Sequence, residues 1–450
     1  MLELVYDRGT LLLKGGVLNL LPGFFKWDRR VGCFRALAFK YVEAVEYLEK
    51  AGVKFKDKVL EAPPTPIKPV KEVKLRSYQK AALKAWNRNK RRGIIVLPTG
   101  AGKTRVALAA IALTSAPTLI VVPTLELMDQ WERAIKKFFT AKVGRFGGGK
   151  KNLEALTIAT YDSAYINAER LGNKFLLLIF DEVHHLPSPG YRQIAELNAA
   201  PYRLGLTATP EREDGLHAGL SALVGPIVYR LGAKDLAGRY LADFDIVRIR
   251  VKLGEGERRR YRELMDKYRR YLESRGIKLR SARDFEKLVM KSGLDREARE
   301  ALLAWREARK IAFNASEKIA VLEEILAKHR GDRIIIFTEN NEVVRRISLR
   351  FLIPEITHKT GSDERRAVME KFRKGEINVV VTSKVLEEGV DVPEANVAVV
   401  LSGTGSRREF IQRLGRILRP KEGKKAILYE LVTSGTSETR ISRRRRKGAL

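Results

Sequence analysis

Short runs of β-branched and other apolar residues recur along most of this chain, and helix-like segments separate them. Five such runs lie between residues 93 and 207, and four more lie between residues 333 and 431. Strands that are apolar throughout are typical of parallel sheets, because helices bury both faces of such a sheet. The sequence therefore predicts an α/β fold with two parallel sheets of similar size.

The length of 450 residues also predicts several domains, since a single core rarely serves more than about 250–300 residues. Four prolines within residues 63–69 exclude a helix or a central strand there and indicate a stiff linker. We expect a small α/β domain at 1–62, a linker at 63–74, a first sheet domain at 75–240, a connector with a basic helical insertion at 241–315, a second sheet domain at 316–435 and a basic tail at 436–450.

Two of these segments are strongly basic. Residues 257–310 have no strand signal and hold 18 Lys and Arg against 10 Asp and Glu. This excess favours a contact with nucleic acid, although a solvated helical bridge with ion pairs is the commoner explanation of such a charge run. The run Arg443–Lys447 in the tail predicts a disordered arm that binds phosphate.

The whole chain has 87 Lys and Arg against 54 Asp and Glu, a formal net charge of +33. This excess predicts a polyanionic partner, nucleic acid before a membrane surface. No apolar run reaches the roughly 18–20 residues that span a bilayer, and the first residues lack a secretory pattern. We therefore expect a cytoplasmic, nucleoid-associated protein with no membrane partner. The single cysteine, Cys33, excludes an iron–sulfur cluster, and the five histidines, which no second ligand cluster accompanies, predict no zinc site.

A glycine-rich turn follows the first apolar run, with the sequence Leu97-Pro-Thr-Gly-Ala-Gly-Lys-Thr104. Its glycines allow backbone N–H groups to approach phosphate oxygens, and a helix that starts near Lys103 would point its positive end at them. In such a loop the lysine reaches the β- and γ-phosphates of ATP, and Thr104 binds Mg²⁺. The predicted ATP-binding residues of the loop are Thr99, Gly100, Ala101, Gly102, Lys103 and Thr104.

An acidic pair, Asp181 and Glu182, ends another apolar run. Unpaired charge is costly to bury, so a carboxylate pair at the end of a buried strand suggests a function. Asp181 would hold Mg²⁺, and Glu182 would take a proton from the attacking water. Taken alone, the pair would be better explained as ordinary surface charge. Beside the glycine-rich turn, it predicts the second half of a hydrolytic site.

These two motifs resemble those of superfamily 2 helicases, and five further motifs of that family occur in order between residues 75 and 430. The resemblance implies two RecA-like lobes that use ATP and Mg²⁺. It also implies that Arg416 and Arg419 act on the γ-phosphate, although a paired structural arginine is the alternative. By this resemblance the remaining site residues are Arg76 and Gln79 at the adenine, Pro123 and Thr124 on the DNA backbone, Thr207 and Thr209 in the coupling motif, Thr382, Gly389 and Asp391 in the fifth motif, and Gln412 beside the two arginines.

Within this superfamily the chain is similar to archaeal members of the XPB family. Arg212-Glu213-Asp214 resembles an arginine–glutamate–aspartate element of that family, and the basic insertion resembles its thumb. Residues 26–35 resemble its damage-recognition domain. A solvated loop held by local ion pairs is the alternative interpretation of the Arg212 element, whereas the resemblance implies a wedge that separates strands.

The resemblance implies an ATP-dependent 3′–5′ DNA helicase or duplex-opening translocase that acts in repair or transcription. It also implies a monomer that acts on DNA junctions, with a nuclease as a candidate partner, because archaeal relatives often work with one. Two other functions stay open. One is a double-strand DNA translocase of the restriction-motor type, and the other is an ATP-gated DNA-binding switch with little unwinding.

Overall fold

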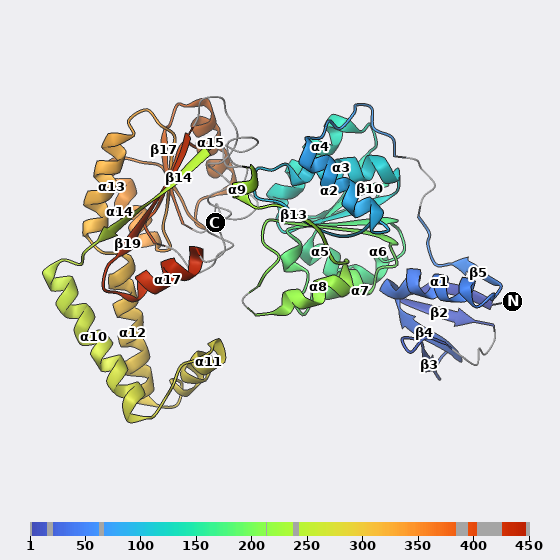
Figure 1. Cartoon of the computed structure of the whole chain (residues 1–450), viewed down its shortest axis with the longest axis horizontal. Helices are drawn as coiled ribbons and strands as arrows, with labels where there is room; N and C mark the ends of the chain where they lie inside the picture. The colour runs from blue at the N-terminus through green and yellow to red at the C-terminus, as the bar shows by residue number, and fades with distance from the viewer. Residues whose placement is uncertain are drawn as a thin grey trace. The chain divides into compact units, whose positions relative to one another are not determined.

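The computed structural model describes residues 2–15, 21–62, 67–212, 214–236, 243–383, 395–402 and 425–446. The chain divides into two compact units, the first spanning Met1–Leu236 and the second most of Ala237–Leu450 (Figure 1). Each unit is built around its own large sheet. No helix in the described ranges has the length and apolar character needed to cross a bilayer.

A small five-stranded sheet with the strand order β3-β4-β2-β1-β5 opens the first unit. The strand β1 pairs antiparallel with β2 across a turn in which Arg8 and Gly9 have φ of 45° and 87°. The segment Cys33–Leu37 forms a strand against β2, and the helix α1 begins after it at Tyr41. The elements are β1 (Leu2–Asp7), β2 (Thr10–Lys14), β3 (Lys26–Asp28), β4 (Cys33–Leu37), α1 (Tyr41–Lys50) and β5 (Phe55–Lys58).

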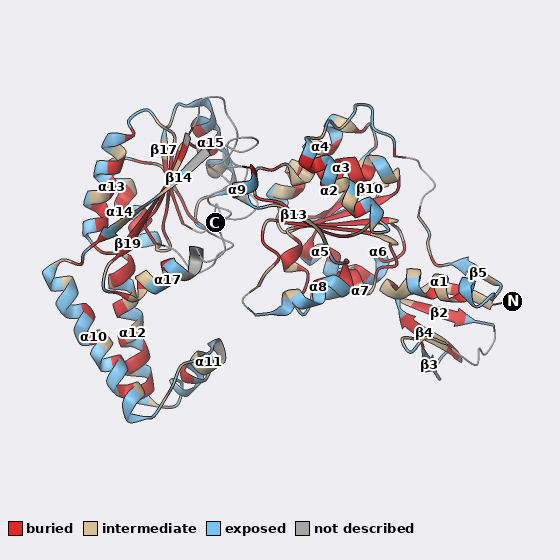
Figure 2. Ribbon diagram, viewed as in Figure 1, coloured by how far each residue is buried: buried red, intermediate tan, exposed pale blue. Residues whose placement is uncertain are grey.

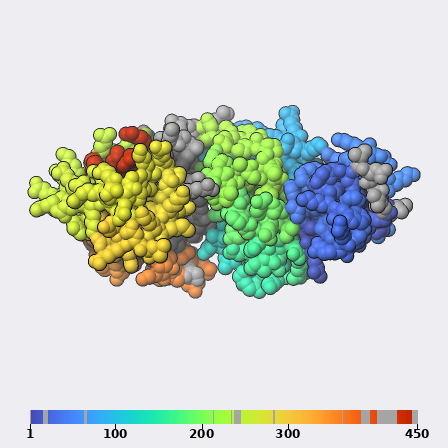
Figure 3. Space-filling model, turned by 90° about the horizontal axis from the view of Figure 1, so that it is seen from below, coloured from blue at the N-terminus to red at the C-terminus, as the bar shows by residue number. Residues whose placement is uncertain are grey.

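This small domain contacts the larger part of the first unit through Tyr6 on β1. The Tyr6 hydroxyl donates to the backbone carbonyl of Glu169 at 2.7 Å and lies 3.0 Å from that of Leu197. A Cβ on Gly172 would lie 1.9 Å from the same hydroxyl, so only glycine allows this approach. Figure 3 shows the two surfaces, blue and green, directly side by side.

The larger part of the first unit is an eight-stranded sheet with the order β13-β6-β12-β11-β7-β10-β8-β9. Its strands are parallel apart from the short edge strand β9. The central strands are buried along their whole length, as the apolar runs predicted (Figure 2). The strands are β6 (Arg92–Val96), β7 (Thr118–Val122), β8 (Val143–Gly147), β9 (Lys150–Lys151), β10 (Leu156–Thr160), β11 (Leu177–Asp181), β12 (Tyr202–Thr207) and β13 (Ile227–Arg230).

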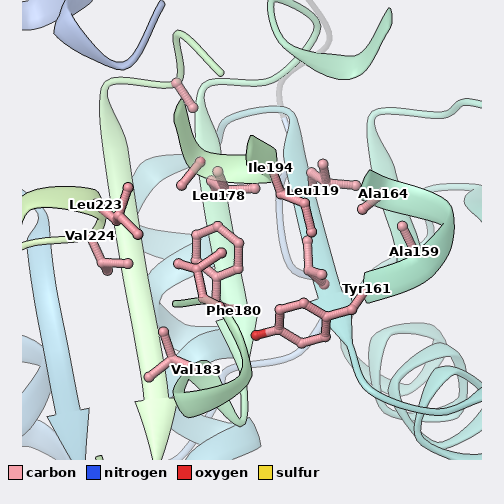
Figure 4. Close-up of a cluster of buried hydrophobic side chains, with 14 of the residues drawn as sticks. Leu119, Ala159, Tyr161, Ala164, Leu178, Phe180, Val183, Ile194, Leu223 and Val224 are labelled. Carbon is pink, nitrogen blue, oxygen red and sulfur yellow. The ribbon is translucent and has the colours of Figure 1, made fainter. Parts of the chain in front are cut away.

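Helices cover both faces of this sheet. Figure 1 shows α2, α3 and α4 on one face and α5, α7 and α8 on the other. On the second face, Leu178, Phe180 and Ile194 pack into one apolar core (Figure 4). The helices are α2 (Ser77–Arg88), α3 (Lys103–Thr114), α4 (Leu125–Phe138), α5 (Tyr161–Ile166), α6 (Ala168–Leu171), α7 (Arg192–Glu196), α8 (Leu220–Leu223) and α9 (Ala233–Leu236).

The second unit holds a six-stranded, fully parallel sheet with the order β14-β19-β18-β15-β17-β16. Its edge strand, β14, comes from residues 243–251, which we expected to be part of a connector. The run Phe-Asp-Ile-Val-Arg-Ile-Arg-Val has polar residues between its apolar ones, as suits an edge strand, and so lacks the continuous apolar signal of the others. The strands are β14 (Asp243–Val251), β15 (Ile334–Phe337), β16 (Glu355–Ile356), β17 (Val379–Thr382), β18 (Val397–Val400) and β19 (Lys425–Thr433).

The basic insertion follows β14 as three helices, α10 (Glu255–Ser274), α11 (Ala282–Lys291) and α12 (Arg296–Phe313). The long helices α10 and α12 pack along each other with buried tyrosine, leucine and alanine side chains between them. The helices next to the sheet are α13 (Glu317–Lys328), α14 (Asn341–Phe351) and α15 (Ser362–Lys374).

The expected disordered tail is instead a helix, α17 (Ser437–Arg446). Its Glu438 is 1% exposed, and both of its carboxylate oxygens accept from Lys318 Nζ, at 2.9 and 2.8 Å. Burial raises the pKa of Glu438, and the Lys318 ammonium acts in the opposite direction. This buried pair and the packing of Ile441 against α12 hold the helix in place. The arginine run in the sequence does not predict either contact.

Candidate nucleotide-binding site

The glycine-rich turn links the end of β6 to the start of α3, as its sequence predicted. Gly100 and Gly102 have φ of 83° and 77°, in the left-handed region that favours glycine. A Cβ on Gly102 would lie 2.5 Å from the side-chain nitrogen of Gln79, so a side chain there would displace the Gln79 amide. The loop therefore presents backbone N–H groups at the N-terminus of α3, where an anion is stabilised.

Lys103 lies at that helix N-terminus, close to the acidic pair. Its Nζ is 3.9 Å from Glu182 Oε1 and 3.5 Å from the carbonyl of Leu97. Both charged side chains are mostly shielded, with 11% of Lys103 and 16% of Glu182 exposed. The structure thus brings together the predicted phosphate-binding lysine and the predicted base.

Asp181 ends β11, and hydrogen bonds fix its carboxylate. Its Oδ2 accepts from Trp131 Nε1 at 2.8 Å, and its Oδ1 accepts from the Glu182 backbone N–H at 3.0 Å. The Tyr161 hydroxyl, labelled in Figure 4, donates to the Asp181 carbonyl at 3.1 Å. Trp131 and Tyr161 were not among the predicted site residues. Both have the pattern of core residues, so no sequence signal distinguished them.

The donors near Lys103 suit a magnesium–nucleotide complex. Thr104 and Asp181 offer hydroxyl and carboxylate oxygens, and Mg²⁺ typically takes one or two such protein ligands beside phosphate oxygens. The buried Thr99 hydroxyl has no hydrogen-bond partner within the described part of the chain, which suits a group that binds a ligand oxygen. These residues would hold the ion without a dedicated cage.

Glu182 is linked to the coupling motif through His184. The Glu182 backbone is left-handed, with φ of 47°, which is uncommon for a non-glycine residue and indicates local strain. His184 is fully buried, and its Nδ1 lies 3.1 Å from Thr207 Oγ1 and 3.4 Å from Glu182 Oε2. Thr207 Oγ1 also accepts from the Thr209 backbone N–H at 3.1 Å. A continuous contact path therefore joins the predicted base to Thr207 and Thr209.

Gln79 lies against the phosphate-binding loop at the start of α2. Its Nε2 donates to the Ala101 carbonyl at 2.9 Å, and its Oε1 accepts from the Arg76 backbone N–H at 2.8 Å. The Tyr78 hydroxyl donates to the same Ala101 carbonyl at 2.8 Å. The predicted adenine-binding motif and the loop thus meet in one place.

The predicted DNA-contact residues of the first unit lie at the ends of elements. Pro123 and Thr124 follow β7, and Thr124 Oγ1 accepts from the Leu127 backbone N–H at 3.3 Å, which caps α4. Thr382 ends β17 in the second unit and is buried.

Arg212 does not project from the first unit. Its guanidinium pairs with Asp214 at 2.6 Å and donates to the His184 carbonyl at 2.7 Å. The Arg212 side chain is 18% exposed, and its hydrogen bond to Asp214 lowers the pKa of that carboxyl to about 2. The described part of this element therefore resembles the locally ion-paired loop that we kept as the alternative.

Several predicted site residues lie outside the described residues. They are Glu213, Gly389, Asp391, Gln412, Arg416 and Arg419.

Matches to family models cover most of the chain. Residues 4–59 match the Xeroderma pigmentosum group B helicase damage recognition domain, and residues 303–448 match the ERCC3/RAD25/XPB C-terminal helicase. Residues 72–212 match the res subunit of type III restriction enzymes. The DNA 3′-5′ translocase XPB2 of Sulfurisphaera tokodaii is 49% identical over 448 residues, which cover 99% of this chain and 100% of the relative. This chain belongs to the XPB family of helicases.

Two more distant comparisons agree with this family. The DNA 3′-5′ helicase XPB of Mycobacterium tuberculosis is 33% identical over 83% of this chain, which spans 63% of that relative. The crystal structure of the Pyrococcus furiosus Hef helicase domain covers 82% of this chain and 97% of its own, with a TM-score of 0.53 at 21% identity. The expected fold of two RecA-like, parallel-sheet lobes is confirmed.

The XPB-family models correspond to structural elements of this chain. The damage-recognition model covers the small five-stranded sheet, and the C-terminal helicase model begins inside α12 and reaches beyond α17. The helix α17 therefore lies within the family's C-terminal helicase region, which supports its place in the second lobe rather than in a free tail.

Proposed function

We propose that this XPB-family chain is an ATP-dependent DNA helicase or duplex-opening translocase with 3′–5′ polarity. The observation that carries the proposal is the meeting of Lys103, at the start of α3, with Glu182, which directly follows Asp181 at the end of β11. The polarity and the DNA substrate follow from the full-length similarity to a DNA 3′-5′ translocase.

The predicted nucleotide-site residues of the first lobe each have a chemical role in this proposal. Lys103 and the loop N–H groups bind the β- and γ-phosphates, and Thr104 and Asp181 hold Mg²⁺. The ion, when bound, neutralises charge that develops on the phosphates. Glu182 orients the attacking water and accepts its proton. Arg76 and Gln79 bind the adenine edge.

The second lobe would complete this site. We propose that Arg416 and Arg419 stabilise charge on the γ-phosphate, with Gln412 beside the water and with Gly389 and Asp391 at the nucleotide. Thr382 would contact the DNA backbone, as would Pro123 and Thr124 of the first lobe. Thr207 and Thr209 would couple nucleotide state to DNA.

The helical insertion would act as a thumb that contacts DNA through one face of α10. A groove of about 490 Å³ lies between α10 and the turn at Ser434–Gly435. Among described residues, no carboxylate pairs with Lys252, Arg258 or Arg262 of this groove. Unpaired cations in a groove suit a phosphate backbone.

Partners and location follow as further parts of the proposal. The Encephalitozoon cuniculi relative, 29% identical, is a general transcription and DNA repair factor IIH helicase/translocase subunit XPB. We propose a monomeric, cytoplasmic protein on the nucleoid that serves repair or transcription, with a nuclease as its candidate partner.

One comparison distinguishes this function from its alternatives. Strand displacement from a forked duplex and displacement of a triplex strand are measured at equal ATP turnover. A helicase displaces the duplex strand, whereas a restriction-type motor displaces only the triplex strand. Hydrolysis with neither displacement would indicate an ATP-gated switch and contradict the proposal.

A further inference from the structure

Trp131 links the proposed DNA contact at Thr124 to the proposed magnesium ligand Asp181 in the first lobe. It belongs to α4, the helix that begins directly after Thr124, where we place a DNA phosphate. Its indole N–H donates to Asp181 Oδ2 at 2.8 Å. Trp131 and Asp181 are 1% and 6% exposed, so this hydrogen bond is shielded from water.

The Trp131 indole does more than pack in the core, because its hydrogen bond orients the Asp181 carboxylate. The Trp131 and Glu182 N–H groups each hold one oxygen of Asp181. Such partners orient a metal-binding carboxylate, and losing one commonly costs 10–100-fold in metal affinity or activity. Movement of the indole would therefore change how Asp181 presents its remaining lone pairs.

The other predicted magnesium ligand also adjoins Trp131. Thr104 of α3 and Trp131 of α4 line the same hollow of about 260 Å³. Close-packed interiors resist displacement, whereas a hollow leaves room for one helix to shift against its neighbour. A small movement of α4 can thus reach both Thr104 and Asp181.

The helix itself can transmit such a movement. Trp131 is seven positions after Thr124, which is roughly 10 Å along a helix axis. Met128, Trp131 and Ile135 form its buried face, and Thr124 caps its first turn. A phosphate bound at this N-terminus would act on the same rigid element that holds the indole.

We propose that Trp131 is a positioning residue through which DNA at the N-terminus of α4 sets the orientation of Asp181 and hence the affinity for magnesium. The inference rests on the proposed function, because it takes Asp181 as a magnesium ligand and Thr124 as a DNA contact. It adds a physical route for DNA stimulation of ATP hydrolysis.

The chain offers a matched control for this residue. Trp86 of α2 is fully buried in the same lobe, and its indole N–H donates to the Arg203 carbonyl at 2.9 Å. Trp131→Phe and Trp86→Phe each remove one indole N–H and keep an aromatic ring. Only the first removes a donor from Asp181.

Binding of a fluorescent ADP is measured against Mg²⁺ concentration, with and without DNA. In Trp131→Phe we expect the half-saturating Mg²⁺ to rise roughly tenfold and to lose its response to DNA. Trp86→Phe should retain the wild-type values. Equal Mg²⁺ dependence in the two variants would overturn the proposal, because the indole would then be only a packing group.

A second measurement uses the wild-type protein, so it does not depend on whether a site variant folds. The chain has four tryptophans and therefore four indole ¹H–¹⁵N signals. Adding DNA without nucleotide should move the Trp131 signal and leave the Trp86 signal in place. A Trp131 signal unaffected by DNA would overturn the coupling. Wild-type ATPase that does not respond to DNA would instead contradict the proposed function and the coupling with it.

Discussion

Lys103 and Glu182 face each other across 3.9 Å, with most of both side chains shielded from water. At this separation each charge partly neutralises the other, so a bound phosphate would compete with Glu182 for the ammonium. The proposed mechanism gives the two residues separable roles, because Lys103 would bind phosphate and Glu182 would accept a proton from water.

Glu182→Gln should abolish ATP hydrolysis but retain nucleotide binding, because glutamine keeps the shape and lacks the base. A positioned base typically contributes 10²–10⁴-fold, and we expect a loss of that order in steady-state turnover. Lys103→Ala should lose both binding and turnover. The control is Glu196→Gln, which changes an ion-paired glutamate with 17% exposure in the same lobe. Normal turnover in Glu182→Gln would contradict its assignment as the base.

The Arg212–Asp214 pair allows a second test at this scale. Asp214→Ala should release the guanidinium from its ion pair and should change thermal stability little, since exposed pairs contribute about 0–1 kcal/mol. If this element separates strands, unwinding per ATP should fall. Glu211→Ala is the control, because it breaks a neighbouring and more exposed pair, that of Glu211 with Arg230 at 2.9 Å. Equal unwinding in both variants would identify the element as surface loop.

At the scale of elements, α10 presents two different cationic faces. One faces the groove with Arg258 and Arg262. On the other, Arg260 pairs with Glu307 at 3.1 Å and Lys267 pairs with Glu300 at 2.9 Å. The ion-paired bridge that the sequence left open is present on this second face, whereas the nucleic-acid contact that we propose would use the first.

The two faces make a charge-matched experiment. Arg258→Ala with Arg262→Ala should lower the slope of log K for DNA against log salt by roughly 1.4–1.8, about 0.7–0.9 for each lost phosphate contact. Arg260→Ala with Lys267→Ala removes the same charge from the same helix and should leave the slope almost unchanged. Equal slopes in the two double variants would remove the groove as a phosphate site.

The helix α17 gives the second lobe a buried ion pair. Glu438→Gln would leave Lys318 charged and buried without a carboxylate, and breaking such a pair typically costs about 3–5 kcal/mol. Urea unfolding measures this loss. Glu323→Gln breaks an exposed pair with Arg350 in the same lobe and should cost under about 1 kcal/mol. A similar stability for both variants would show that α17 is not part of the folded lobe.

At the scale of the whole molecule, the net charge of +33 suits a chain that follows a polyanion. The affinity of the intact protein for DNA should therefore fall steeply as salt rises, and its ATPase should rise with added DNA. Filter binding and steady-state hydrolysis at several salt concentrations measure both. Affinity that does not change with salt would exclude nucleic acid as the main partner.

The sequence alone determined the two parallel sheets, the phosphate-binding turn and the acidic pair. Each depends on local chemistry, since a buried parallel strand must be apolar throughout and a phosphate-binding turn needs glycine at left-handed positions. Gly100 and Gly102 have those conformations, and Lys103 begins the expected helix.

Features that depend on contacts between residues distant in the sequence became apparent only in the tertiary structure. Trp131 and Asp181 are 50 positions apart, and in sequence the tryptophan has the same signal as its core neighbours Met128 and Ile135. The strand β14 and the helix α17 were likewise missed. An edge strand with polar residues between its apolar ones and an arginine-rich run become ordered elements through pairing with β19 and through the buried Lys318–Glu438 contact. Local patterns cannot encode a partner that lies over a hundred residues away.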